Sequence, residues 1–73
     1  MKIQEIPVAS VSSYARNPRR HPPRQIELLA QSIKEFGFTN PVLVDKDGIL
    51  IAGHGRMEAA RKLGMEKVPA VRL

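Results

Sequence analysis

Residues 37–56 decide the fold, and they read GFTNPVLVDKDGILIAGHGR. Two apolar runs, 41–44 and 49–52, flank the sequence Asp-Lys-Asp-Gly, whose Asp and Gly residues favour a tight turn. This pattern predicts a strand, a turn with positive φ at Gly48, and a second strand. Because both runs are apolar almost throughout, we expect strands that are covered on both faces. The sequence Gly53-His54-Gly55 then ends the second strand and predicts a sharp turn into a helix.

Two helices are expected. The first begins near Arg24, with Pro23 suited to its first turn and Gly37 placed as the left-handed residue that ends it. Its apolar residues recur at helical spacing and so share one face: Ile26, Leu29, Ala30 and Ile33. The second helix is expected over about residues 55–63, closed by Gly64. Its inward residues are predicted to be Met57, Ala60 and Leu63.

Two further strands complete the predicted elements. Residues 2–8 form a short strand in which Pro7 lies at an end or on an edge, because proline has no N–H for a sheet ladder. Residues 67–73 form the last strand, with Val71 and Leu73 on one face. The order β-α-β-β-α-β within one pair of layers favours an α+β (mixed α/β) sandwich built on a small mixed sheet.

Length and composition bound the function classes. A chain of 73 residues is expected to form one domain, 1–73, and its end inside the last strand favours a fragment or a module of a longer DNA-acting protein. The absence of Cys excludes disulfides, thiolate metal sites and cysteine nucleophiles. No signal peptide or long apolar run is visible, so we expect a cytoplasmic protein without a membrane partner.

The positive charge is concentrated in one segment. The chain has 12 Lys and Arg against 7 Asp and Glu, and four of its seven arginines lie within residues 16–24. This proline-rich segment is expected to be a loop. Its candidates for contact with DNA or with a nucleotide's phosphates are Arg16, Asn17, Arg19, Arg20 and Arg24. The alternative is a solvated basic loop.

The turn at residues 53–56 is the first candidate site. A glycine-rich turn into a helix exposes free N–H groups at the positive end of the helix dipole, which suits an anion or a phosphate. Arg56 adds a guanidinium that matches phosphate oxygens, and His54 could donate to a phosphate or carry a proton near neutral pH. The alternative is a plain turn in which Gly53 and Gly55 relieve backbone strain.

The connection between the first helix and the next strand is a second candidate. Thr39 and Asn40 offer a hydroxyl and an amide there, although a helix cap and a turn would explain the same residues. No metal site of the protein's own is predicted, because no carboxylate has ligand spacing to either histidine. Glu58 is considered for a Mg²⁺ ion carried in with a nucleotide, beside the simpler interpretation of a solvated helix residue.

These motifs, together with Asn17-Pro18-Arg19 and the final VPAVRL, resemble the ParB/sulfiredoxin fold over nearly the whole chain. The likeness is to ParB-type N-terminal domains, including those of phage proteins and those beside DNA methyltransferases. It implies that Gly37 and Pro41 match a GxxxP motif, and that Gly53 and Arg56 match the ends of a GERR-like motif. In ParB proteins these two motifs bind CTP with Mg²⁺. His54 and Gly55 stand where the second motif has Glu and Arg.

The sequence thus supports three hypotheses. The first is a ParB-type nucleotide- or phosphate-binding module, acting in or beside a protein that binds, segregates or modifies DNA. Its ligand would be CTP or another NTP with Mg²⁺, held by Gly37, Thr39, Asn40, Pro41, Gly53, His54, Gly55 and Arg56. The second is direct, non-specific DNA binding through residues 16–24, with nuclease activity, and the third is a ligand-free module for dimerisation or docking. Enzymatic activity stays open between a weak NTPase and a nuclease, whereas the absence of Cys excludes a sulfiredoxin reaction.

Overall fold

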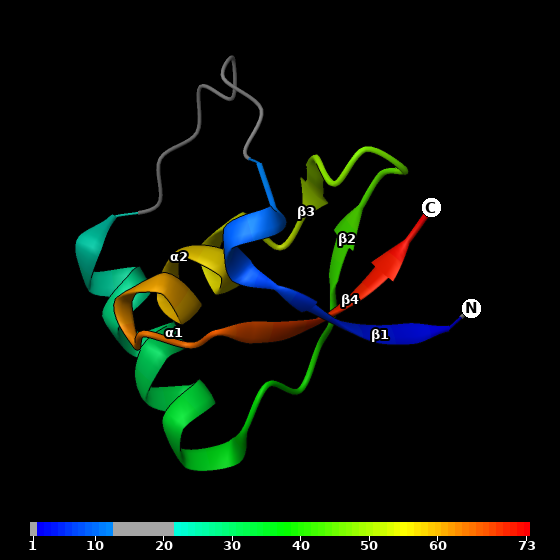
Figure 1. Cartoon of the computed structure of the whole chain (residues 1–73). Coiled ribbons are helices and arrows are strands. Elements are labelled where there is room, and N and C mark those ends of the chain that lie inside the picture. The colour runs from blue at the N-terminus through cyan, green and yellow to red at the C-terminus, as the bar shows by residue number, and fades with distance from the viewer. Residues whose placement is uncertain (1, 13–21) are drawn as a thin grey trace.

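The computed structural model describes residues 2–12 and 22–73 as a four-stranded sheet with two α-helices (Figure 1). The elements are β1 (Ile3–Pro7), the 3₁₀ turn η1 (Val8–Ser10), α1 (Pro23–Phe36), β2 (Val42–Val44), β3 (Leu50–Ala52), α2 (His54–Lys62) and β4 (Lys67–Arg72). Apart from the added η1, this is the predicted order, and the α+β class is confirmed. No helix in the described part of the chain is long and apolar enough to span a membrane.

The sheet is mixed, with the strand order β1-β4-β2-β3. The last strand in the sequence, β4, lies between β1, to which it is antiparallel, and β2, to which it is parallel. β2 and β3 form an antiparallel hairpin. Pro7 is the last residue of β1, and β1 is an edge strand, so the prediction for this proline is confirmed.

The turn of the hairpin is built around one carboxylate. Asp45 Oδ1 accepts hydrogen bonds from the backbone N–H groups of Asp47, at 2.8 Å, and Ile49, at 3.0 Å. Gly48 completes the turn with a φ of +80°, as predicted. Asp45 therefore has a conformational role that explains its presence in the turn.

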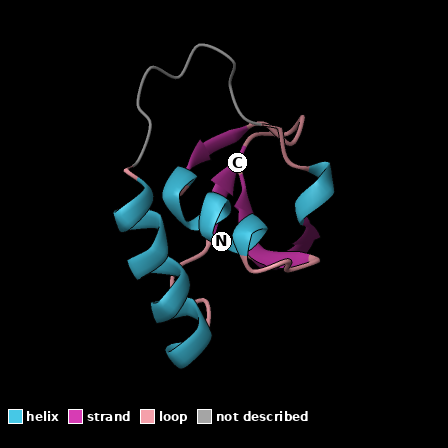
Figure 2. Cartoon of the chain, turned by 90° about the vertical axis from the view of Figure 1, so that its left-hand side faces the viewer, coloured by secondary structure: helices cyan, strands magenta, loops and turns pink. Residues whose placement is uncertain are grey.

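The two helices do not both lie on the sheet. α2 packs on one face of the sheet, and α1 packs against α2 (Figure 2). The predicted face of α1 is confirmed, because Ile26 and Ala30 are buried against Ala59 of α2, with Leu29 and Ile33 packed around them. The expected single pair of layers is wrong, because the apolar face of α1 packs on α2 and not on the strands.

The main core lies between α2 and the sheet. Its largest fully buried side chains are Met57, Val42, Val44 and Val68. The expectation that both faces of the hairpin strands are covered is wrong. Leu43 is half-buried and Ile51 is 47% exposed, because α1 and α2 are stacked on the same side of the sheet.

The end of α2 differs from the prediction at one inward residue. α2 spans His54–Lys62, and Leu63 is exposed at its end rather than packed inside. Gly64, with a φ of +73°, closes the helix as predicted. After the turn at Gly64, the Met65 N–H donates a hydrogen bond to the Ala60 carbonyl at 3.0 Å. The side chain of Met65, in place of that of Leu63, packs against the core.

Candidate functional site: the start of helix α2

The backbone N–H groups at the start of α2 have no side-chain cap. Gly53 precedes the helix with φ +92° and ψ +28°, a left-handed conformation that favours glycine. The first turn closes when the Met57 N–H donates to the Gly53 carbonyl at 2.9 Å. The N–H groups of the three residues between them point out of the helix end, where the dipole is positive. This end of α2 therefore suits an anion.

Gly53 also lets the helix start touch strand β2. A Cβ atom at Gly53 would lie 2.8 Å from Val42 Cγ1 and 3.2 Å from Val42 Cα, closer than side chains tolerate. Because Val42 directly follows Pro41, this contact brings the end of the 37–41 connection to the first turn of α2. The two sequence motifs thus meet at one place in the fold. Val42 is the residue that sequence reasoning missed, and no local pattern marks it as the partner of a glycine eleven positions away.

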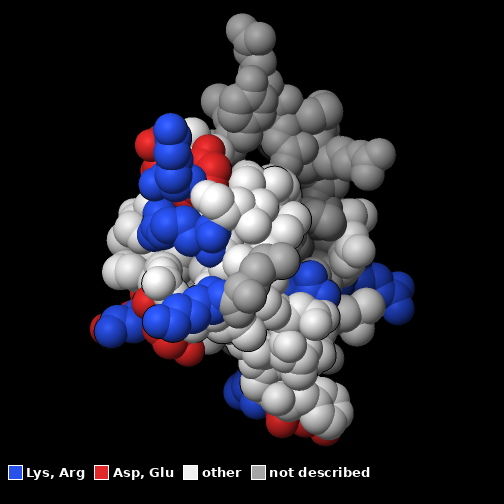
Figure 3. All heavy atoms as spheres, turned by 90° about the vertical axis from the view of Figure 1, so that its right-hand side faces the viewer, with Lys and Arg blue, Asp and Glu red and all other residues white. Residues whose placement is uncertain are grey.

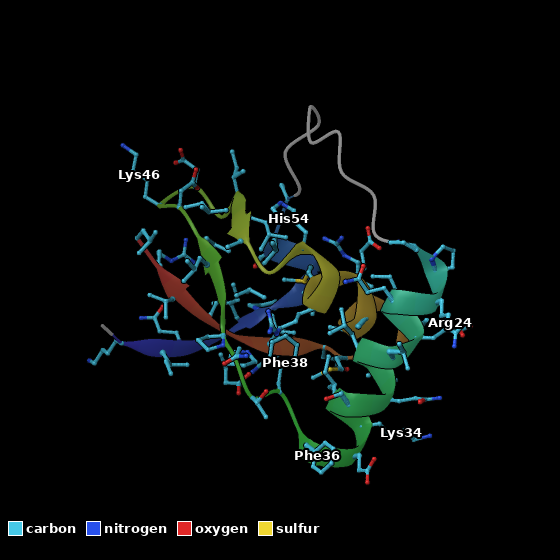
Figure 4. The ribbon with its side chains drawn as sticks, turned by 180° about the vertical axis from the view of Figure 1, so that it is seen from behind. Arg24, Lys34, Phe36, Phe38, Lys46 and His54 are labelled. Atoms are coloured by element: carbon cyan, nitrogen blue, oxygen red, sulfur yellow. The ribbon has the colours of Figure 1, made fainter. Side chains whose placement is uncertain are left out.

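The 37–41 connection leaves α1 in an extended direction. Gly37 has the predicted positive φ of +81°, but its ψ of −179° is extended and not that of a left-handed helical residue. The chain then runs toward β2, and Phe38 packs half-buried against the core. Figure 4 shows Phe38 over the body of the domain and Phe36 at the outer end of α1. Thr39 and Asn40 are exposed, so both polar side chains are accessible to a ligand.

Arg56 and Glu58 lie on opposite sides of α2. Successive side chains along an α-helix are rotated by about 100° about its axis, so side chains two residues apart point in nearly opposite directions. Arg56 falls between Ala59, which faces α1, and Met57, which faces the sheet. It is half-buried, and its guanidinium forms no hydrogen bond or ion pair with another described residue. The Arg56 side chain is therefore available to a ligand, between the residues of α2 that face α1 and those that face the sheet.

His54 and Glu58 lie on the outer side of the same helix. They are one turn apart, with His54 half-buried and Glu58 exposed. Among the described residues, no group of three or more His, Asp or Glu side chains could hold a metal ion. The predicted roles of Glu58 with a nucleotide-borne Mg²⁺ and of His54 with a phosphate stay predictions.

The basic segment is only partly described. Arg16, Asn17, Arg19 and Arg20 lie outside the described residues, so their predicted contacts stay predictions. Arg24 is exposed in the first turn of α1 and points outward, away from His54 (Figure 4). At the other end of the segment, Ser12 forms an isolated parallel bridge with Ile49, the residue before β3. Arg24 is thus not part of the group formed by the 37–41 connection and the start of α2.

A model of the ParB N-terminal domain matches residues 1–72. The chain belongs to the ParB N-terminal domain family. The predicted resemblance is therefore confirmed, and this membership places the domain among proteins related to chromosome partitioning and nucleoid occlusion.

Two curated relatives illustrate the range of proteins that carry such a domain. The chain is 49% identical over 71 residues to the ParB-like nuclease domain-containing protein YnaK of Escherichia coli K12, covering 97% of the chain and 82% of that protein. It is 40% identical over 80 residues to the nucleoid occlusion protein of Bacillus cereus AH187, covering 96% of the chain. The chain spans only 26% of that second, much longer relative.

Solved structures confirm the fold. C-terminally truncated ParB from Caulobacter crescentus, complexed with CTP-γ-S, superimposes with a TM-score of 0.89 at 28% identity, over 100% of this chain and 44% of that one. The same protein complexed to the centromeric parS site gives a TM-score of 0.86 at 28% identity, over 96% of this chain and 40% of that one. Sulfiredoxin from Arabidopsis thaliana gives 0.90 at 25% identity, over 100% of this chain and 85% of that one.

Proposed function

We propose that this ParB N-terminal domain binds the phosphates of a nucleotide between the 37–41 connection and the start of α2. The observation that carries the proposal is the contact of Gly53 with Val42, which joins the two motifs at an uncapped helix end beside Arg56. The fold it shares with a CTP-γ-S complex of ParB supports a nucleoside triphosphate such as CTP. In the cell, the domain would act in or beside a protein that binds, segregates or modifies DNA.

Each residue has a role that its chemistry suits. The backbone N–H groups of Gly55 and Arg56 donate to phosphate oxygens, and the Arg56 guanidinium balances their charge. Thr39 and Asn40 line the site with a hydroxyl and an amide, and His54 donates from the outer side of the turn. The donors fit a phosphate chain, whereas the described residues offer no acidic cluster for Mg²⁺. Such an ion would therefore be held mainly by the phosphates themselves.

Isothermal titration tests this proposal directly. Wild-type domain is titrated with CTP, ATP and GTP, each with and without Mg²⁺. Arg56→Ala should weaken binding by roughly 10- to 100-fold, because a hydrogen bond to a charged group contributes about 1.5–3 kcal/mol. The matched control is Arg24→Ala, which removes an exposed arginine from α1 and should leave the affinity unchanged. The absence of heat with every nucleotide would reject the proposal, as would equal losses in the two variants.

Direct DNA binding is the second candidate function. It is supported by the net charge of +5, by the exposed Arg24, and by the parS complex of the related ParB. Binding through phosphates should weaken steeply and similarly on all DNA sequences as salt rises, measured by fluorescence anisotropy. The double variant Arg19→Glu/Arg20→Glu should abolish it, whereas Arg56→Ala should not. Binding that ignores salt would contradict this function, and a cleavage assay with Mg²⁺ tests the nuclease alternative separately.

A further inference from the structure

The sulfur atoms of this protein all belong to methionine side chains. The chain contains no cysteine and three methionines, Met1, Met57 and Met65. Thiols and thioethers are the side-chain groups that peroxides oxidise, so without Cys the thioethers of methionine are the targets. Met1 lies outside the described residues. In the described part of the chain, the difference between Met57 and Met65 therefore decides where oxidation occurs.

The two described methionines differ in burial. Met57 is 0% exposed and lies in the core between α2 and the sheet. Met65 is only half-buried and packs against the same core from the turn between α2 and β4. The residues beside it in this turn are exposed, and Gly64 has nothing within 4 Å of the position of a Cβ atom. A small oxidant therefore reaches Met65 directly, whereas it reaches Met57 only when the domain opens.

Met65 is separate from the candidate phosphate site. That site lies at the start of α2, whereas Met65 follows the end of this nine-residue helix, which is about 13 Å long. The turn that carries Met65 is drawn in orange at the left of Figure 1, and β4 leads from it to the C-terminal end at the right. Figure 3 shows the side of the two chain ends, with most of its charged groups along the left margin. A change at Met65 therefore acts on the packing of α2 and β4, not on phosphate binding.

We propose that Met65 is an oxidation site, which peroxides convert to methionine sulfoxide. A lone pair of the Met65 sulfur attacks one oxygen of hydrogen peroxide and forms the sulfur–oxygen bond. The bond between the two peroxide oxygens breaks, and the second oxygen leaves as water after proton transfer. The sulfur is oxidised and the peroxide is reduced, each by one electron pair.

Oxidation of Met65 loosens the junction between α2 and β4. The Met65 side chain packs against the core cluster that contains Ala60 of α2 and Val68 of β4, both of which are 0% exposed. A sulfoxide places a strongly polar oxygen at this contact, and burial of a polar group without a hydrogen-bond partner is unfavourable. The oxidised side chain therefore leaves the core, and the end of α2 loses apolar contacts.

Peptide mapping by mass spectrometry measures where oxidation occurs. In hydrogen peroxide, the folded protein should form the sulfoxide at Met65 at least about tenfold faster than at Met57, because a fully buried side chain reacts only through opening of the structure. In concentrated urea the two rates should become equal, since unfolding exposes both thioethers. Equal rates in the folded protein would overturn the proposal, as would a Met65 that stays unoxidised there.

Urea denaturation followed by circular dichroism measures the effect on stability. Peroxide should lower the urea midpoint of the wild type by roughly 1 M, and methionine sulfoxide reductases with dithiothreitol as the electron donor should restore it. Met65→Leu nearly conserves the side-chain volume, so it should fold and keep its midpoint after peroxide. Met57→Leu is the matched control, because it retains Met65 and should still lose stability. A loss in Met65→Leu as large as in the wild type would overturn the proposed effect of Met65.

Discussion

Replacement of Gly53 by alanine tests the contact that brings the two motifs together. The new Cβ would lie 2.8 Å from Val42 Cγ1 and 3.1 Å from Val42 Cβ, and residue 53 would keep a φ of +92°. Overpacking a core costs about 1–3 kcal/mol. The left-handed backbone costs an L-residue about 1–2 kcal/mol more, and part of this is offset by the reduced freedom of the unfolded chain. We expect Gly53→Ala to lower the free energy of unfolding by about 2–4 kcal/mol.

Gly64→Ala is the matched control, because Gly64 has a φ of +73° but nothing within 4 Å of the position of its Cβ. It should therefore lose only about 1 kcal/mol, from the backbone alone. Urea denaturation followed by circular dichroism gives both values. In a double-mutant cycle, Val42→Ala should reduce the cost of Gly53→Ala, because it removes the methyl group that the new Cβ meets first. If Gly53→Ala were no more destabilising than Gly64→Ala, the close approach of α2 to β2 would be refuted.

Three further substitutions probe the surrounding structure by the same denaturation assay. Asp45→Ala should cost about 1 kcal/mol, because two backbone N–H groups of the hairpin lose their acceptor, while Asp47→Ala should stay within about 0.5 kcal/mol of wild type. Ala59→Leu should cost about 1–3 kcal/mol, because Ala59 is fully buried between the helices; an unchanged stability would contradict the packing of α1 on α2. Glu27→Ala should change stability by less than about 0.5 kcal/mol, because its 3.5 Å ion pair with Lys62 joins two exposed side chains; a larger loss would show an unexpected role for this pair.

Several local features could be predicted because they depend on neighbours in the sequence. The spacing of Ile26 and Ala30 defined the buried side of α1, and the Asp45 turn followed from turn chemistry. Gly37 and Gly64 were placed correctly at the ends of the two helices, since a chain that leaves a helix often needs positive φ. For the candidate site, the sequence identified the two motifs but not how they meet.

Other features depend on contacts between distant segments and could not be predicted locally. Leu63 and Met65 are both apolar and close to the end of α2, and only the turn at Gly64 decides which of them packs inside. Val68 and Val71 are equally apolar and both buried, yet Val68 belongs to the core under α2 while Val71 points to the other side of the sheet. Alternation along a strand defines two faces without saying which one a helix will cover.

The sequence by itself determined the order of the elements, the class of the fold and its likeness to ParB-type domains, because periodicity, turn residues and short motifs are local properties. The tertiary structure decided that β4 lies between β1 and β2, that α1 packs on α2, and that Gly53 touches Val42. These contacts join residues that are far apart along the chain, and their geometry depends on how whole faces pack together. For that reason the candidate phosphate site depends on the tertiary structure, because the residues of its two motifs become neighbours only when α2 packs against β2.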